Sequence, residues 1–401
     1  MISTFGEVFE VDPKIKIAKN SDVPFIEMAD IEPWARTVGS KRTKKFAGGS
    51  KFLDGDVLVA RITPSLENGK TSIYRASKSA KSAPAGGSTE FIVVRGIAGR
   101  SLSEFAYYLL RTADLRSHLI ANMNGSSGRQ RVQADALRNY VVDLPSIDEQ
   151  RRIAGVLGAL DDKIESNLRV RNLCRDLGGN LVADTVRSAP STQLEHYAAS
   201  ISRGVTPRYY KDEDASPVLV LNQKCIRDGW VTPELARLMI PRAREKSQAI
   251  ARLDDLLVNS TGQGTLGRVA RWDSDDPIYV DSHVTVVKAD PRRIYPVLMP
   301  YLVFPLQDEI EHMATGSTGQ TELSPSRLAQ LNVPLLSLEE QRPLSARLVA
   351  LEAQAHYCQV QSLKLTELRD ALLPELMSGR MRVDEAGRLV SEALDEEVAD
   401  V

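Results

Sequence analysis

Polar residues suited to binding a polyanion are grouped in three predicted loops of the first 145 residues. The loops contain Lys41-Arg-Thr-Lys-Lys, Arg61-Ile-Thr-Pro-Ser and Gly125-Ser-Ser-Gly-Arg-Gln-Arg. Lys and Arg neutralise phosphates at any nucleotide sequence, whereas Arg, Gln and Asn on rigid loops can hydrogen-bond to base edges. Each loop alone is also compatible with an ordinary solvated surface. Together they indicate nucleic acid as the ligand to consider first.

Residue patterns typical of catalysis are not found in this sequence. There is no P-loop, and no Asn/Asp-Pro-Pro-aromatic tetrapeptide of the kind that amino-methyltransferases use. Gly262-Gln-Gly-Thr-Leu-Gly has the spacing of a dinucleotide-binding loop, but the next residues predict a strand instead of the required helix. The five histidines lack the spacing of a metal site. We therefore expect no catalytic residue, no metal site and no cofactor for this chain.

Charge is unevenly distributed although the formal net charge is only −2. Residues 1–145 contain 21 Lys and Arg against 15 Asp and Glu, while the segment from Asp384 onward contains seven acids and one base. A near-neutral chain can therefore present a basic face. No apolar run reaches the roughly 18 residues of a membrane span, and the N-terminus lacks the pattern of a secretory signal. Three widely separated cysteines favour a reducing cytoplasm.

A long internal repeat organises the sequence. The segment LPSIDEQRRIAGVLGAL, which begins at Leu144, matches LLSLEEQRPLSARLVAL, which begins at Leu335. Glu149-Gln-Arg becomes Glu340-Gln-Arg, and the register holds without a gap from Gly125/Gly316 to Leu181/Leu372. A match of this length indicates a tandem duplication.

Each copy of the repeat predicts a long amphipathic helix. Ser146 with Glu149, and Ser337 with Glu340, fit capping boxes at the helix starts. Apolar residues then recur every three or four positions, which is typical of a helix-pairing seam, although the same stripe also suits packing on a globular core. The expected pairing residues are Ile153, Leu157, Leu160, Ile164, Leu344, Leu348, Leu351 and Ala355. Gly178-Gly179 is expected to end or bend the first helix, and Asp161-Asp162 is expected to lie on its solvated face.

The segments that precede the two helices predict similar β-rich domains. Residues 25–28, 53–59 and 91–95 match residues 218–221, 253–258 and 284–288, whereas the loops between these strands differ, and 41–45 has no clear counterpart. The fold class is α+β. The expected division is domain 1 at 1–145, helical arm 1 at 146–189, domain 2 at 190–336, helical arm 2 at 337–380 and an acidic tail at 381–401. A chain that folds back on itself would place the arms antiparallel.

The chain resembles the specificity subunit of type I restriction-modification systems. The resemblance rests on the EQ-containing helix starts, the Leu/Ile helices, the Gly-Ser-x-Gly segments before them and the closing Met377-Ser-Gly-Arg-Met-Arg-Val. It implies two target-recognition domains separated by an antiparallel coiled coil, each reading one half of a split double-stranded DNA target. It also implies two methyltransferase subunits and ATP-dependent restriction subunits as partners, with no catalytic activity in this subunit. Two departures from the pattern are Leu336 in place of proline and a first domain without Gly-x-Thr-Pro.

The resemblance and the loop chemistry together suggest where DNA contacts would lie. We expect Arg, Lys, Asn and Gln side chains of the loops to make them. In domain 1 the candidates are Arg42, Lys44, Lys45, Arg61, Arg129 and Gln130, and in domain 2 they are Arg208, Asn222, Lys224, Asn259, Gln263 and Gln320. Two alternatives remain at this stage: a coiled-coil scaffold that does not bind DNA, and a component of a fused restriction-methylation enzyme.

Overall fold

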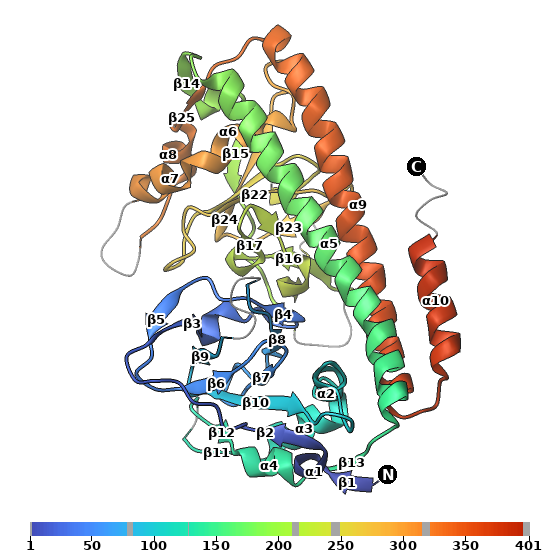
Figure 1. Cartoon of the computed structure of the whole chain (residues 1–401). Coiled ribbons are helices and arrows are strands. Elements are labelled where there is room, and N and C mark those ends of the chain that lie inside the picture. The colour runs from blue at the N-terminus through green and yellow to red at the C-terminus, as the bar shows by residue number, and fades with distance from the viewer. Residues whose placement is uncertain are drawn as a thin grey trace. The chain divides into compact units, whose positions relative to one another are not determined.

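The computed structural model describes residues 2–77, 83–126, 128–210, 216–241, 249–314 and 321–395. The chain divides into two compact units, one formed by Met1–Ser166 with Gln361–Val401 and the other by Asn167–Val360. Each unit contains one β-rich domain and part of each of two long helices (Figure 1). Domain 1 comprises residues 2–143 and domain 2 comprises residues 191–334. The predicted α+β class is confirmed.

Domain 1 is built on two sheets formed from short, largely apolar strands. The first sheet has the order β2 (Phe9–Val11), β10 (Phe91–Gly96), β7 (Val57–Ala60), β8 (Thr71–Tyr74) and β4 (Thr37–Val38). The second has the order β5 (Thr43–Lys45), β3 (Asp22–Ile26), β9 (Ala85–Gly87) and β6 (Ser50–Phe52). Strands β7 and β8 are buried along their whole length, as the continuous apolar sequence of β7 predicts.

Short elements complete domain 1. They are β1 (Ile2–Thr4) paired with β13 (Val141–Asp143), β11 (Met123–Asn124) paired with β12 (Arg131–Val132), and helices α1 (Phe5–Val8), η1 (Met28–Asp30), α2 (Ser103–Leu109), α3 (Ala113–Ala121) and α4 (Ala134–Arg138). Helices α2 and α3 follow each other closely, with residues 110–112 between them. The β1–β13 pair brings the start of the domain to its end.

Domain 2 repeats this plan. Its first sheet has the order β15 (Ala198–Arg203), β24 (Val284–Ala289), β21 (Leu256–Asn259) and β22 (Val269–Arg271). Its second sheet has the order β19 (Arg237–Met239), β16 (Val218–Leu221), β23 (Ile278–Val280) and β20 (Ile250–Ala251). Short pairs are β14 (Ser191–Gln193) with β25 (Asn332–Pro334), and β17 (Ile226–Arg227) with β18 (Trp230–Val231). Its helices are η2 (Leu194–His196), η3 (Gln223–Cys225), η4 (Pro233–Leu235), α6 (Leu298–Val303), η6 (Phe304–Leu306), α7 (Gln307–Met313) and α8 (Pro325–Ala329).

The two domains share strand order and strand direction. In β5-β3-β9-β6 and in β19-β16-β23-β20 the inner pair is parallel and both outer pairs are antiparallel. The strand matches expected from the sequence are confirmed by the pairs β3/β16, β7/β21 and β10/β24. The prediction that residues 41–45 form a loop without a counterpart is wrong for 43–45. These residues form β5, whose counterpart is β19.

Two helices of 40 residues each follow the domains. They are α5 (Ile147–Val186) and α9 (Leu338–Met377), and a helix of this length measures about 60 Å. Ser146 and Ser337 cap the helices by accepting hydrogen bonds from the backbone N–H groups of Glu149 and Glu340 at 3.2 and 3.3 Å. Gly379, with a φ of 72°, follows the end of α9, where a left-handed glycine is common.

Gly178 and Gly179 do not end α5, contrary to the expectation from the sequence. The helix continues to Val186. Position 178 is a glycine because Tyr301 packs closely against the helix there. A Cβ atom at this position would lie 2.6 Å from Cε1 of Tyr301, which packs against the helix there. A side chain at position 178 would therefore push α5 away from α6. Relative to alanine, a glycine within a helix lowers helix stability by roughly 1 kcal/mol, but here it permits the contact between α5 and Tyr301.

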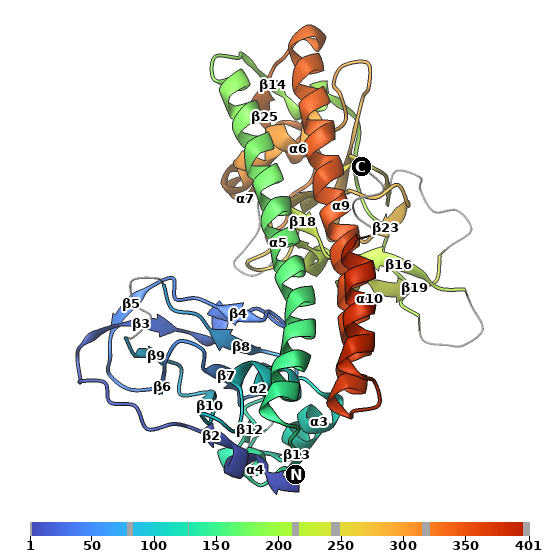
Figure 2. The ribbon, with the colours of Figure 1, turned by 45° about the vertical axis from the view of Figure 1, so that its right-hand side comes forward.

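The two helices pack side by side and antiparallel, as the views in Figure 1 and Figure 2 agree. Within the first unit, Ile153, Leu157 and Leu160 of α5 share a buried cluster with Leu365 and Leu372 of α9. The same cluster includes Phe105 and Tyr108 of α2. The apolar stripe therefore serves both purposes considered from the sequence, since it contacts the other helix and the core of the domain.

The corresponding stripe of α9 behaves in the same way within the second unit. Leu344 and Leu348 share a buried cluster with Val182 of α5 and Tyr301 of α6. Ala355 is also buried, whereas Leu351 and Ile164 are half-buried.

The segment predicted as an acidic tail contains a helix, α10 (Val383–Asp395). Val383, Ala386 and Val390 are buried in the cluster that contains the start of α5 and the end of α9. Arg152 of α5 pairs with Asp384 of α10. Asp384, Glu385 and Glu392 therefore lie on an amphipathic helix that packs against the paired helices of the first unit.

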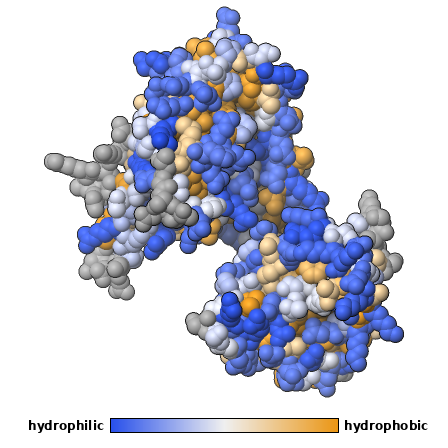
Figure 3. Space-filling view, turned by 90° about the vertical axis from the view of Figure 1, so that its left-hand side faces the viewer, coloured by the Kyte–Doolittle hydropathy of each residue, from blue (hydrophilic) through white to orange (hydrophobic). Residues whose placement is uncertain are grey.

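No helix among the residues described here is long and apolar enough to cross a membrane. On the face shown in Figure 3, hydrophilic residues cover most of the surface of each domain, with smaller apolar areas between them.

Candidate nucleic-acid interface

In each domain, the loop that follows the central strand meets the segment that leads into a short helix. In domain 1 this contact is a β-bridge between Ile62 and Arg131, and in domain 2 it is a β-bridge between Thr261 and Glu322. We name these places the domain 1 junction (residues 61–69 and 128–132) and the domain 2 junction (residues 260–267 and 321–323). In domain 1 this contact brings two of the three predicted loops together, and the repeat forms the equivalent contact in domain 2.

The domain 1 junction is held by charged side chains. Arg131 forms an ion pair with Glu90 at 2.7 Å. Arg61 donates hydrogen bonds to the Val132 carbonyl at 3.1 Å and to Oε1 of Gln133 at 2.6 Å. Because both bonds are made within the domain, the Arg61 side chain holds the loop after β7 against residues 132–133.

Two of the candidate residues lie on this junction with more accessible side chains. Arg129 is exposed and Gln130 is half-buried. The Gln130 carbonyl accepts a hydrogen bond from the Thr63 backbone at 3.0 Å, which fixes the loop beneath them. The structure thus brings Arg61, Arg129 and Gln130 together.

The remaining candidates of domain 1 lie on or beside β5, in the other sheet. Arg42 pairs with Glu27 at 2.6 Å and with Asp30 at 2.8 Å, and Lys44 also pairs with Glu27. Lys44 lies 5.2 Å from the centroid of the Phe25 ring. Lys45 is exposed and belongs to the same strand. The group is therefore a partly neutralised cationic edge, separate from the junction.

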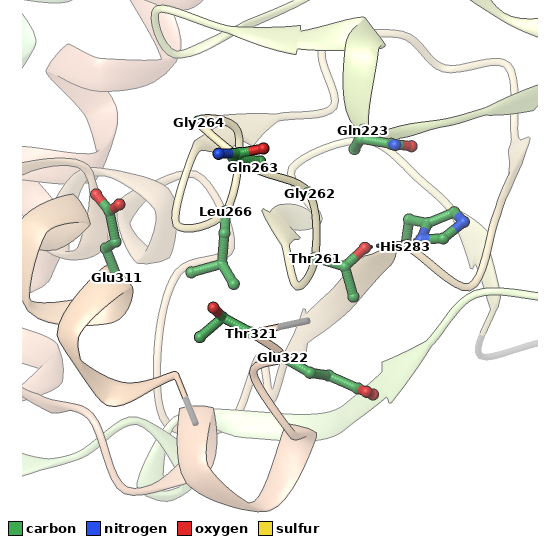
Figure 4. A pocket seen from close by; sticks show the side chains of 10 residues that line it. All are labelled: Gln223, Thr261, Gly262, Gln263, Gly264, Leu266, His283, Glu311, Thr321 and Glu322. Carbon is green, nitrogen blue, oxygen red and sulfur yellow. Dashed lines mark hydrogen bonds between the residues drawn. The ribbon is translucent and has the colours of Figure 1, made fainter. Parts of the chain in front are cut away.

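The domain 2 junction surrounds a pocket of about 630 Å³ (Figure 4). Most of the residues that line it have polar side chains. The lining consists of Gln223, Thr261, Gly262, Gln263, Gly264, Leu266, His283, Glu311, Thr321 and Glu322. Nδ1 of His283 and Oγ1 of Thr261 lie 2.7 Å apart, and the His283 backbone N–H donates to Asp281 at 2.8 Å. Burial raises the pKa of the Asp281 carboxyl above its usual value.

Glycines shape the loop that carries Gln263. Gly262, Gly264 and Gly267 have φ angles of 106°, 70° and 84°, a region that other residues rarely adopt. The loop is closed by the hydrogen bond from the Leu266 N–H to the Gly262 carbonyl at 2.9 Å. Gln263 is exposed within this closed loop. The glycine spacing noted in the sequence therefore forms a tight turn before strand β22, as predicted.

Two candidates of domain 2 are buried, so the expectation that they touch DNA is not retained. Asn222 is 6% exposed, and its side chain accepts from the Lys224 backbone and donates to the Leu235 carbonyl. Asn259 is 0% exposed and donates to the carbonyls of Gln223 and Thr265 at 2.9 and 3.0 Å. Both amides hold the backbone instead of facing a ligand.

The other candidates of domain 2 are distributed over different segments. Gln263 lies on the junction, and Lys224 is exposed on η3 beside Gln223, which lines the pocket. Arg208 is exposed, and its carbonyl accepts a hydrogen bond from Ile240 next to β19, away from the junction segments. Gln320, the repeat equivalent of Arg129, lies outside the described residues.

The glutamine of the repeated EQ motif has a structural role that the sequence did not indicate. Gln150 is 0% exposed; its Oε1 accepts from the Leu102 N–H at 3.0 Å, and its Nε2 donates to the carbonyls of Arg100 and Pro145 at 3.0 Å. This side chain therefore joins the start of α5 to the segment that leads into α2.

Gln341 makes the same three bonds in the second unit. It accepts from Tyr295 at 3.0 Å and donates to the carbonyls of Arg293 and Leu336 at 3.0 and 2.9 Å. Each helix start is thus fastened to the domain that precedes it.

A buried carboxylate is also repeated. Asp161 of α5 is 5% exposed, accepts from the Tyr108 hydroxyl at 2.8 Å and pairs with Arg369 of α9 at 2.7 Å. The expectation that Asp161 lies on a solvated face is therefore wrong, because an arginine from the other helix neutralises it. Burial, followed by the nearby carboxylate, raises the pKa of the Tyr108 hydroxyl, which keeps it a donor.

Glu352 of α9 is the repeat equivalent of Asp161. It is 4% exposed, accepts from the Tyr301 hydroxyl at 2.6 Å and pairs with Arg271 of β22 at 2.9 Å. Arg175 of α5 approaches it to 3.6 Å. In both units, one buried carboxylate therefore joins the domain, the helix that carries it and the other helix.

Comparisons with known proteins agree with the sequence resemblance. Residues 1–172 match the family described as Type I restriction modification DNA specificity domain. The chain is 27% identical over 209 residues to the type I restriction enzyme EcoEI specificity subunit of Escherichia coli, a match that covers 50% of this chain and 35% of that protein. It is 26% identical over 164 residues to the EcoAI specificity subunit of Escherichia coli, covering 38% and 26% of the two chains. The matches thus span about a third of these relatives or less.

A solved structure has a related fold over nearly the whole chain. It is the S subunit of a type I restriction-modification system from M. genitalium, with a TM-score of 0.54 and 14% sequence identity, covering 94% of this chain and 95% of that one. At this identity the similarity concerns the fold, which includes two β-rich domains and two long packed helices.

Proposed function

We propose that the chain is a specificity subunit of a type I restriction-modification system and that its two domains each read one half of a split DNA target, a proposal that the matches to that family support. The observation that carries the proposal is the combination of closely similar sheet topology, which differs by the added edge strand β4 of domain 1, with unlike junctions. Two copies of one scaffold that differ at the same exposed place are suited to binding two different short sequences. Joining two weak sites in one chain raises affinity through effective concentration.

The two helices would set the gap between the half-sites. Each helix has 40 residues and is therefore stiff on the scale of a DNA turn. The repeated Gln150 and Gln341 fasten each domain to a helix start. A fixed attachment of each domain is what a constant gap requires. The same helices would dock two methyltransferase subunits.

Catalysis in this proposal belongs to the partners. Methyltransferase subunits would transfer a methyl group from S-adenosylmethionine to adenine, and restriction subunits would use ATP to move along and cut DNA. The specificity subunit would supply sequence recognition through side chains alone, without a cofactor or a metal of its own.

The side chains proposed to contact DNA follow from their exposure. Arg129 and Gln130 at the domain 1 junction, and Gln263 at the domain 2 junction, are proposed to contact base edges, because Arg129 and Gln263 are exposed and Gln130 is half-buried beside Arg129. Lys44, Lys45, Lys224 and Arg208 are proposed to position the phosphate backbone. Arg42 and Arg61 are proposed to act mainly through the scaffold, because both are held by neighbouring groups.

The proposal is tested by co-expressing the chain with its cognate methyltransferase and mapping methylated adenines across the genome by long-read sequencing. The expected result is a single motif made of two short half-sites with a fixed gap. A contiguous motif would contradict the two-domain arrangement. A stable complex that binds and methylates no specific DNA would instead favour the scaffold function.

A further inference from the structure

Amide groups form one wall of the domain 2 pocket. Gln223 comes from η3, and Gln263 comes from the glycine loop after β21. In the view of Figure 4 these two glutamines lie on one side of the pocket, while Thr321 and Glu322 lie on the opposite side. A side-chain amide offers one acceptor and one donor on the same plane, which matches the N6 and N7 edge of adenine.

Asn259 fixes the two glutamine-bearing segments to each other. Its buried Nδ2 donates to the carbonyl of Gln223 and to the carbonyl of Thr265, in the loop that carries Gln263. One side chain thus holds both segments at defined positions, so Gln223 and Gln263 face the pocket from a rigid base. Asn259 is a positioning residue in this arrangement, since it is 0% exposed.

Carboxylates complete the lining. Glu311 of α7 and Glu322 face the same pocket, and Arg203 of β15 pairs with Glu322 while donating to the Leu323 carbonyl at 2.8 Å. Carboxylate oxygens accept hydrogen bonds and repel both phosphates and carbonyl oxygens. The pocket is therefore matched to a neutral group that carries an amino substituent, and mismatched to a phosphate.

We propose that the domain 2 pocket reads an adenine through Gln263 and Gln223, with the carboxylates selecting for its exocyclic amino group. Adenine presents an N7 acceptor and an N6 donor, whereas guanine and thymine present carbonyl oxygens at the corresponding position. Cytosine presents an amino donor but no N7 acceptor, so we expect the pocket to bind it less strongly than adenine and more strongly than guanine or thymine. This assignment rests on the proposed function and names the base that this site recognises.

The domain 1 junction lacks this chemistry. Matching the β-bridges of Ile62 and Thr261 places Pro64 at the position of Gln263. The equivalent of Glu322 is Arg131, which reverses the charge at that wall. The two junctions therefore cannot read the same base in the same way, and domain 1 supplies a matched control.

The test compares sequences selected from a random DNA pool by the complex of the chain with its methyltransferase subunits. The proteins are the unchanged chain, Gln263→Ala, Gln223→Ala and the domain 1 control Gln130→Ala. Gln263→Ala and Gln223→Ala should each lower discrimination at one adenine of the second half-site by roughly 10- to 100-fold and leave the first half-site unchanged. Gln130→Ala should leave that adenine position unchanged.

A second variant keeps the inference falsifiable if truncation disturbs the loop. Gln263→Glu keeps the size and removes the donor, so preference at the same position should move from adenine toward cytosine. Gln263 variants that select the same adenine as strongly as the unchanged chain would overturn the assignment. If the unchanged chain selects a split motif and the Gln263 variants still select the same adenine, only the pocket assignment is rejected. If the unchanged chain selects no sequence, the proposed function and the pocket assignment are both rejected.

Discussion

Domain 1 and domain 2 have similar sheets, but the cations in their contacts with helix α5 come from opposite sides of the contact. In the first unit, Arg36 of domain 1 donates to the Gly158 carbonyl of α5 at 3.1 Å and pairs with Asp162. In the second unit, α5 supplies the cations, because Arg171 and Arg175 lie 3.6 and 3.8 Å from the Trp230 ring of domain 2. Desolvation lowers the pKa of Arg171 to about 10.

The junctions differ more than the attachments. In domain 1, ion pairs such as Arg131 with Glu90 hold the loops, and the exposed side chains include the cation Arg129. In domain 2, glycines and the buried Asn259 hold the loops, and the exposed side chains include the amide Gln263. The duplicated scaffold therefore carries two kinds of recognition chemistry.

What the domains share is buried polar structure. Gln150 and Gln341 make equivalent hydrogen bonds in both units, and Asp161 and Glu352 each accept from a tyrosine hydroxyl of their domain, although their arginine partners differ. A buried polar group that loses its partner is costly, so such groups resist change. Exposed junction residues carry no such cost and are free to diverge.

Removing the repeated carboxylates should have the largest effect and tests whether the two units are held alike. Glu352→Ala and Asp161→Ala each remove the buried carboxylate that pairs with an arginine and accepts from a tyrosine hydroxyl, which leaves Arg271 with Asp254 alone and Arg369 with Asp370 alone. Each variant should lower the free energy of unfolding by about 3–5 kcal/mol. Urea denaturation of the variants measures this. Asp176 of α5 is exposed and provides the control. Asp176→Ala should change the free energy of unfolding by no more than roughly half a kcal/mol. A large loss for one carboxylate and none for the other would show that the two units are held differently.

Removing the repeated glutamines should cost somewhat less. Gln150→Ala and Gln341→Ala each remove three hydrogen bonds to backbone groups, and each should lower the free energy of unfolding by about 2–4 kcal/mol. The exposed neighbours Arg151 and Arg342 provide matched alanine controls. Equal stability of the glutamine variants and their controls would show that these bonds do not fasten the domains.

Arg129→Ala should separate the two recognition sites. Arg129 is exposed at the domain 1 junction, so its loss should reduce discrimination in the first half-site by roughly 10- to 100-fold. The second half-site should not change. Motif mapping of the methylated adenines measures both halves at once. An equal loss in both halves would mean that Arg129 contacts a phosphate or supports the fold.

Lys45→Ala and Lys224→Ala should have the smallest effects. Both side chains are exposed, and a phosphate contact contributes affinity without sequence information. Each variant should weaken binding a few-fold with an unchanged motif, and the slope of log K against log salt should fall by about 0.9 per contact. Filter binding across a salt series measures the slope, and an altered motif in either variant would contradict the assignment.

The sequence was sufficient to predict the parts of the fold that depend on periodicity. The apolar spacing of Ile153, Leu157 and Leu160 predicted α5, and the matching spacing after Ser337 predicted α9. The predictions failed where partners are remote in sequence. Asp161 looked solvated because its partner Arg369 lies 208 residues away.

The candidate site shows the same limit. Loop composition predicted Gln263 and Arg129, which are exposed at the junctions, but composition cannot distinguish an exposed amide from a buried one. Asn259 therefore looked like a reading residue, although it ties Gln223 to the glycine loop from below. Gln223 was missed because only the fold brings it to the pocket.

Two domains on one helix pair should read half-sites at a fixed distance. The most direct test measures binding of the complex to its mapped target and to targets with one base pair added to or removed from the gap. We predict that either change lowers affinity by about 100-fold or more, because only one domain can then engage its half-site. Equal binding across the three gap lengths would contradict a fixed distance between the two reading domains.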